Sequence, residues 1–260
     1  MKRMILTGIV ALTAGLSGLF AQQPAAPAAP AAPAGPKIKS PAERKAVVAI
    51  QTAMSSGDVD AVIKASEDLL TNYADSDYKE YALTMEANAY HQKRDNDNAR
   101  VYAERVLQIN PKSSTMELLV ADIITPAIKK FDLNKDQEIA QATHLYNDAI
   151  ENVKAAVKPN PQVSDADWEA GRKYAIAQAH NGLAMLAQGQ EKWEDAIKEF
   201  QLAVEGDPEQ DAYSTRLANA YLGAGKKAEA IAICDKLLAK PNLHPQIKAV
   251  VTTIKTQASR

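Results

Sequence analysis

The stretch EKWEDAIKEFQLAVEGDP, residues 191–208, carries the pattern on which the rest of the chain depends. Its apolar residues are spaced by three and four: Trp193, Ala196, Phe200 and Ala203. That spacing puts them on one face of an α-helix. Pro208 then ends the helix, because proline has no backbone N–H to continue the hydrogen-bond ladder. The stretch therefore predicts an amphipathic helix that packs through one face.

The same pattern recurs in two other parts of the chain. A shift of 34 residues brings Ala196 onto Ala230 and Phe200 onto Cys234. A shift of 47 residues in the other direction brings the stretch onto HLYNDAIENVKAAVKPNP, residues 144–161, again with apolar residues at matching places. Recurrence at so many apolar positions predicts one structural unit used several times.

A helical unit of this kind, with its spacing of 34 residues, its alanines and its closing proline, resembles the tetratricopeptide repeat (TPR) family. The resemblance implies an all-α fold, a superhelical array of antiparallel helical hairpins with a C-terminal capping helix. It also implies an interaction scaffold in which the first helix of each hairpin lines a concave groove.

We expect the array, a TPR-like α-solenoid domain, to occupy residues 41–260. The alanines that mark successive second helices are Ala61, Ala99, Ala149, Ala196 and Ala230, spaced by 38, 50, 47 and 34 residues. Only the last spacing matches the family period, so the middle units need longer helices. The helices expected outside residues 191–241 are 41–54, 59–69, 81–93, 98–109, 114–131, 145–157, 165–188 and 246–260. Trp193 and Cys234 are expected to be buried.

The first residues have the features of an export signal. Lys2 and Arg3 precede an apolar run that ends in a small residue, Ala21, so residues 1–21 are predicted to be a signal peptide. The alternative is an uncleaved segment that anchors the protein in the inner membrane. Residues 22–40 form an Ala/Pro-rich linker that we expect to be disordered, serving as a spacer or, alternatively, as a ligand for a proline-binding module.

Composition and isolated motifs give little support to catalysis, metal or nucleic acid. The formal net charge is −2, which offers no electrostatic basis for binding nucleic acid. Asp132, Asn134, Asp136 and Glu138 imitate a calcium loop, but Gln137 replaces its glycine and Thr143 its bidentate glutamate. Either Asp132 or Asn134 is expected to cap a helix instead. We therefore expect no catalytic residue, no metal site and no cofactor.

The resemblance implies a set of partner-binding positions on the first helices. They are Asn88, His91, Asn181, Met185, Arg216 and Asn219. Some family members use such positions, with supporting lysines, to hold the carboxylate end of a peptide. Thr84, Ala212 and Thr215 stand where those lysines would be, so any other groove ligand stays open.

The sequence thus favours an exported TPR scaffold that binds a protein or peptide through its groove, in the periplasm or outside the cell. A role in cell-envelope assembly is one form of this hypothesis. The mature domain is not expected to insert into a membrane. The alternative from another class is a hydrolytic or metal-dependent enzyme built on a helical scaffold.

Overall fold

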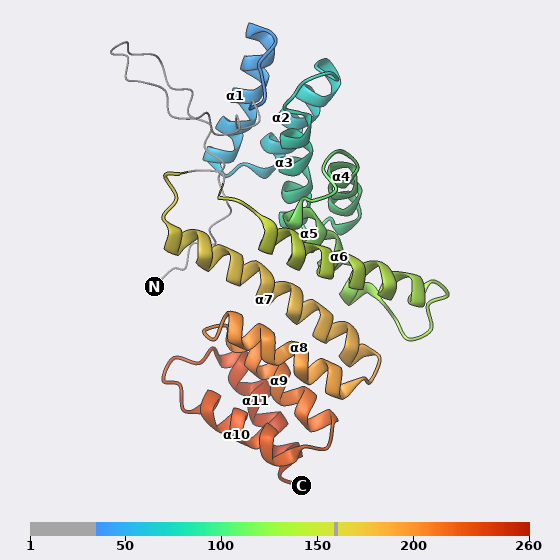
Figure 1. Cartoon of the computed structure of the whole chain (residues 1–260), viewed down its shortest axis with the longest axis vertical. Helices are drawn as coiled ribbons and strands as arrows, with labels where there is room; N and C mark the ends of the chain where they lie inside the picture. Colours follow the sequence, from blue (N-terminus) through green and yellow to red (C-terminus); the bar gives the residue numbers. More distant parts are fainter. Residues whose placement is uncertain (1–34, 159–160) are drawn as a thin grey trace, which may run out of the picture.

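A computed structural model describes residues 35–158 and 161–260, and within these residues the chain is all-α with no strand. The helices, labelled as in Figure 1, are α1 (Pro41–Ser56), α2 (Val59–Asn72), α3 (Lys79–Gln92), α4 (Asn96–Ile109), α5 (Ser114–Ala127), α6 (Lys135–Ala155), α7 (Asp165–Gly189), α8 (Trp193–Gly206), α9 (Asp211–Gly223), α10 (Lys227–Leu238) and α11 (Pro245–Ala258). The predicted signal peptide and linker residues 22–34 lie outside the described residues.

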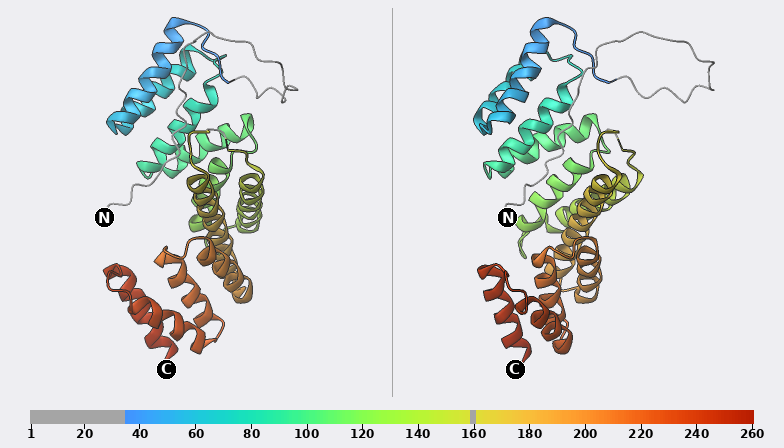
Figure 2. Two further views of the ribbon diagram at one scale, coloured as in Figure 1. Left: turned by 60° about the vertical axis from the view of Figure 1, so that its left-hand side comes forward. Right: turned by 90° about the vertical axis from the view of Figure 1, so that its left-hand side faces the viewer.

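The helices stack in chain order along the long axis of the molecule (Figure 1). Each helix packs on the next, and α11 covers both α9 and α10. The two views of Figure 2 show a bowed stack, in which the first and last hairpins lie on the same side of the middle. The predicted array of antiparallel hairpins with a capping helix is therefore confirmed.

Four hairpins share one kind of turn. Their connections are two or three residues long, and each contains one residue with a left-handed backbone, namely Gly57, Arg94, Glu191 and Gly225, with φ of 72°, 61°, 60° and 75°. In the last three, the next residue's N–H donates to a carbonyl in the preceding helix, as in Lys226 to Tyr221 at 2.9 Å. This bond closes the helix and reverses the chain.

The α5–α6 connection departs from that rule and from the sequence prediction. We expected a helix over 114–131, but α5 ends at Ala127, directly after Pro126, whose missing N–H weakens the last turn. The helix expected at 145–157 instead begins ten residues earlier, at Lys135. Residues 128–134 join α5 to α6. The structure describes all seven, and none of them has a positive φ.

The early start of α6 also removes the calcium-loop alternative. Asp136 and Glu138 lie inside the helix, where alternate residues point in different directions and cannot surround one ion. Asn134 is the N-cap residue by position, but its side chain donates to Glu138 Oε1 at 2.9 Å instead of accepting from the helix start.

Buried alanines let the helices approach, and larger side chains fill the space between them. Phe200, Tyr146 and Cys234 are fully buried, as expected for Cys234. Trp193 is only half-buried, contrary to prediction. As the first residue of α8 it packs against the end of α9 at Gly223.

The register of α2 also differs from the prediction. When the turn residues Gly57 and Arg94 are aligned, the position in α2 that corresponds to Ala99 is Val62 and not Ala61. Val62 is the buried residue of the two.

One core position holds a carboxylate. Glu86 of α3 occupies the place of Leu183 and Leu217 when the turn residues of the hairpins are aligned. It is fully buried, and within the described part of the chain neither carboxylate oxygen has a hydrogen-bond partner. Burial raises the pKa of Glu86 to about 7. The Tyr102 hydroxyl, which lies outside normal hydrogen-bond geometry, opposes this rise, Glu67 adds to it and Arg105 opposes it.

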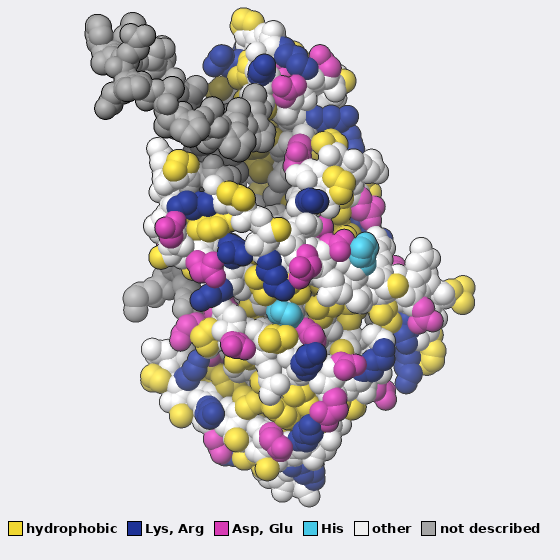
Figure 3. All heavy atoms as spheres, viewed as in Figure 1, with side chains coloured by type: hydrophobic (Ala, Val, Ile, Leu, Met, Phe, Trp, Pro, Cys, Tyr) yellow, Lys and Arg dark blue, Asp and Glu magenta, His cyan; other side chains and the backbone are white. Residues whose placement is uncertain are grey.

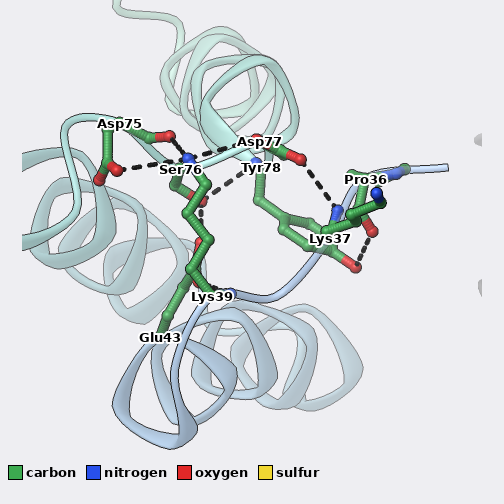
Figure 4. A network of polar contacts seen from close by, with 8 residues as sticks. All are labelled: Pro36, Lys37, Lys39, Glu43, Asp75, Ser76, Asp77 and Tyr78. Carbon is green, nitrogen blue, oxygen red and sulfur yellow. Dashed lines mark hydrogen bonds and ion pairs between the residues drawn. The ribbon is translucent and has the colours of Figure 1, made fainter. Parts of the chain in front are cut away.

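Residues 36–40 enter the domain along the α2–α3 connection (Figure 4). The backbone N–H of Lys37 donates to Asp77 at 3.1 Å, and Lys39 pairs with Asp75 and Asp77 at 3.3 and 3.4 Å. The buried carboxylate of Glu43 accepts a bond from Ser76 Oγ at 2.6 Å, which holds the pKa of Glu43 below its usual range. The end of the expected linker is thus fixed to the domain by polar contacts.

Among the helices of the described residues, none is both long and apolar enough to cross a membrane. On the face shown in Figure 3, lysine and arginine side chains are interspersed with aspartate and glutamate. A face of mixed sign provides no basic stripe for nucleic acid.

Candidate functional site

One stripe of α7 presents polar side chains beside α5 and α9. Gln178, Asn181 and Met185 are spaced by three and four residues and are all half-buried. α5 packs directly on α7, so the stripe lies beside residues of the preceding first helix. A small residue also lets α6 approach α7: a Cβ on Gly182 would lie 2.1 Å from the ring of Tyr146 in α6.

Asp122 of α5 lies at the centre of this region. Its oxygens accept from the Tyr146 hydroxyl at 2.8 Å and from Gln178 Nε2 at 2.5 Å. Burial raises the pKa of Asp122, while these two bonds and the nearby His91 and Arg216 oppose the rise. A groove position of α3 and one of α9 therefore both act electrostatically on the same carboxylate.

Arg216 completes the group from α9. Its guanidinium donates to Asn181 Oδ1 at 2.9 Å, and Asn181 Nδ2 contacts Met185 Sδ at 3.7 Å. We call the surface formed by His91, Asp122, Gln178, Asn181, Met185 and Arg216 the first-helix face. Four first helices, α3, α5, α7 and α9, contribute to it.

The structure therefore brings three of the six predicted positions into contact, Asn181, Met185 and Arg216, and the fourth, His91, acts on Asp122 through its charge. Asn88 and Asn219 are half-buried on the same helices, one turn away from His91 and Arg216. Their part in partner binding stays a prediction.

Sequence reasoning missed Asp122 and Gln178. A signal for Asp122 was present, because it is the only charged residue in LLVADII, residues 118–124. A lone carboxylate in an apolar helical run is either paired or functional. No comparable signal marked Gln178, since a glutamine on a long helix is ordinary surface chemistry.

Two hollows flank Met185. The first, of about 360 Å³, lies between the α5–α6 connection and the α7–α8 turn, with Met185 and Leu186 among its walls. The second, of about 500 Å³ and more open, is lined by Met185, Gln188, Gly189, Glu191, Trp193 and Arg216. Met185, Gly189 and Glu191 border both, so the hollows are continuous with the first-helix face.

No group of three or more His, Cys, Asp and Glu side chains suited to a metal ion occurs in residues 35–158 and 161–260. Two His–carboxylate pairs occur in these residues, His180–Glu199 at 2.7 Å and His144–Asp148 at 3.3 Å. They lie on different helices and share no residue. Nothing in this part of the chain supports the metal-dependent form of the enzyme alternative.

Family models described as tetratricopeptide repeat match residues 81–113 and 186–254. No curated protein matches the chain in sequence. Similar solved structures share its fold at low identity. A thermophilic TPR protein from Thermus thermophilus is 14% identical, with a TM-score of 0.53 over 82% of this chain and 98% of that chain.

Two further structures give the same result. MamA from Desulfovibrio magneticus RS-1 is 14% identical, with a TM-score of 0.52 over 84% of this chain and 98% of that chain. PilW, described as a widely conserved type IV pilus biogenesis factor, is 14% identical, with a TM-score of 0.56 over 84% of this chain and 91% of that chain. At such identities the likeness is one of fold.

Proposed function

Because this chain is a tetratricopeptide-repeat protein, and so an interaction scaffold by fold, we propose that it binds a protein or peptide across its first-helix face. The observation that carries the proposal is the polar line from Asp122 through Gln178 and Asn181 to Arg216. Hydrogen bonds join Gln178 to Asp122 and Arg216 to Asn181, so the line spans three helices. Arg216 and the neighbouring Met185 line the open hollow at its end.

The chemistry of this face suits an extended peptide. Amide side chains such as Gln178 and Asn181 both donate and accept, as a peptide backbone does. Arg216 uses one N–H on Asn181 and lines the open hollow, where its fork of donors can meet a carbonyl or carboxylate. Met185 offers a flexible apolar surface between the hollows, and methionine adapts well to different partners.

The test is capture of a partner by the full-length protein after crosslinking in cells. The groove variant carries Asn88→Ala, Asn181→Ala, Arg216→Ala and Asn219→Ala. The control carries the same residue types changed at exposed sites elsewhere, Asn96→Ala, Asn147→Ala, Asn242→Ala and Arg260→Ala. Circular dichroism verifies that both remain helical.

We expect a partner that is held by the wild type and the control and lost from the groove variant. A partner held equally by all three proteins would refute binding through the first-helix face. The binding site would then lie on the second helices of the hairpins or on the Pro-rich segment.

The proposal extends to place and process. Lys2, Arg3 and the apolar run to Ala21 favour export, with an uncleaved membrane anchor as the alternative. A role in envelope assembly rests on that N-terminal sequence, since the likeness to PilW is one of fold. Cell fractionation with intact-mass measurement tests it: a periplasmic or secreted protein shortened at its N-terminus supports cleavage and export, and a full-length cytoplasmic protein rejects both.

A further inference from the structure

The irregular third hairpin creates a hollow beside a turn of the regular array. Because α5 ends at Ala127, residues 128–130 lie next to the α7–α8 turn and border, with Lys135 of α6, a hollow of about 360 Å³. We call this space the connection hollow. Its volume is within the range of side-chain and small-ligand pockets.

The interior and the rim of the connection hollow differ in chemistry. Apolar walls come from Ile128, Ile139, Met185 and Leu186. Lys129, Lys130 and Lys135 also line it, against the single acidic residue Glu191. Three positive charges facing one negative charge leave a local excess of two positive charges.

Asp132 in the connection and Asp136 and Glu138 in α6 do not line the hollow. Asp132 accepts from the backbone N–H of Lys129 at 2.8 Å, and Glu138 accepts from Asn134 at 2.9 Å. Lys129 and Lys130 are exposed and so available to a partner. The same connection exposes Phe131 at 88% and Leu133 at 106%.

We propose that the connection hollow takes an apolar side chain from a partner segment whose flanking residues are acidic. The apolar walls receive the side chain, and Lys129, Lys130 and Lys135 pair with the flanking carboxylates. Phe131 and Leu133 are covered as the segment docks. The inference rests on the proposed function and narrows it to one partner chemistry.

The predicted linker of this chain does not match that chemistry. Residues 22–34, QQPAAPAAPAAPA, contain no acidic residue. A partner segment from another protein is therefore the occupant we argue for. An anionic membrane, which basic and apolar side chains together can also bind, is the competing outcome.

Fluorescence anisotropy of labelled peptides with the full-length protein provides the test. The acidic probe has a central leucine between aspartate and glutamate flanks. A second probe keeps the leucine between lysine flanks, and a third keeps the acidic flanks but has a central serine. We expect the acidic leucine probe to bind about tenfold tighter than either, with affinity falling as salt rises.

A glycine pair tests the location. Gly189 borders the hollow, and a Cβ there meets no atom within 4 Å, so Gly189→Leu adds a side chain at the hollow from a position where its Cβ causes no clash. Gly171, exposed on the same helix, is equally open and provides the control Gly171→Leu. We expect Gly189→Leu to weaken the acidic leucine probe about tenfold and Gly171→Leu to leave it unchanged.

A charge-matched pair tests the lysines. Lys129→Glu, Lys130→Glu and Lys135→Glu together should abolish the preference for acidic over basic flanks. The control makes the same change at three exposed lysines elsewhere, Lys198→Glu, Lys236→Glu and Lys248→Glu. It shifts the net charge of the protein by the same amount and should retain the preference for acidic flanks.

Equal binding of acidic and basic probes, or equal losses in each variant and its control, would overturn the inference. So would binding of phosphatidylglycerol vesicles, lost in the Lys129 triple variant, with no binding of any peptide probe. A partner captured in cells that survives Gly189→Leu but not the groove variant would leave the proposed function intact and reject the connection hollow.

Discussion

The α9–α10 hairpin and the α5–α6 hairpin are made from similar residues yet differ in what they contribute. In α9–α10, a three-residue connection with left-handed Gly225 returns the chain at once, and Leu217, Ala218 and Cys234 pack inward. In α5–α6, a seven-residue connection separates a short helix from a long one.

The irregular hairpin carries most of the unusual chemistry of the first-helix face. It provides the central carboxylate Asp122, its donor Tyr146 and the exposed connection beside the hollow. A regular turn fixes the stacking of helices and leaves little room for anything else. A longer connection relaxes that constraint, which permits a surface specific to this chain.

The largest expected effect separates architecture from surface. Phe200→Ala, in a fully buried place of the regular array, should destabilise the domain by about 3–5 kcal/mol, through lost burial and the cavity left behind. Phe131→Ala, the same change in the irregular connection, should alter stability by less than about 0.5 kcal/mol. Urea unfolding followed by circular dichroism measures both. Similar losses would mean that the connection is part of the core.

A second prediction challenges the view that regular hairpins are purely structural. Burial raises the pKa of Glu86 to about 7, so the unfolded chain releases this proton at lower pH than the folded domain does. The stabilising contribution of protonated Glu86 is therefore full below about pH 4.5 and is lost as pH rises through 7. Between pH 5 and pH 8 the wild type should lose on the order of 2 kcal/mol more than Glu86→Gln.

Urea unfolding of both proteins at the two pH values gives this difference directly. Other titrating groups contribute equally to the two proteins and cancel. Equal pH dependence in the wild type and in Glu86→Gln would show that the carboxylate is solvated or paired, and that the α3–α4 core is not strained by it.

A third prediction concerns the polar centre of the irregular hairpin. Tyr146→Phe retains the ring against Gly182 and removes the hydroxyl bonded to Asp122. It should destabilise the domain by about 1–2 kcal/mol, because Asp122 loses a donor in a buried place. Thr125→Val, which removes the other partner of that hydroxyl at 3.1 Å, is the milder comparison. A Tyr146→Phe protein as stable as the wild type would place the carboxylate in contact with water.

The smallest expected effect tests the turn that regular hairpins share. Arg94 has φ of 61°, a conformation that costs a side-chain residue roughly 1–2 kcal/mol and glycine almost nothing. Arg94→Gly should stabilise the domain by about 0.5–1 kcal/mol after the greater entropy of the unfolded glycine is included. Arg94→Ala, which keeps the Cβ, should give no gain. Thermal unfolding of the two variants measures the difference.

Sequence periodicity predicted the regular hairpins well, because each repeats the same apolar spacing and ends at a breaker. It failed between residues 114 and 144, where helix propensity alone allows several boundaries. The sequence does contain a mark for the end of α5, Pro126, but it contains no comparable mark for the start of α6 at Lys135. The position of α2 that corresponds to Ala99 was also ambiguous in the sequence, because Ala61 and Val62 both fit an apolar helical pattern.

The candidate site was predictable in part for a different reason. His91, Asn181, Met185 and Arg216 follow from their repeat positions on the first helices, which the fold fixes. Asp122 and Gln178 depend on how α5 packs on α7, and this follows from the irregular connection. The hollow beside residues 128–134 is likewise a property of three-dimensional packing, which no single helix pattern contains.

The polar contacts at the entrance of the chain also have a mechanical consequence. Lys37 and Lys39 hold the segment before α1 along Asp75 and Asp77, and Glu43 joins α1 to Ser76 (Figure 4). Tension applied through the preceding residues would load these contacts in parallel before it reached the first turn of α1. These bonds would then share the applied force and would have to break together before the first hairpin unfolds. Unfolding of α1 one helical turn at a time would not be the first event.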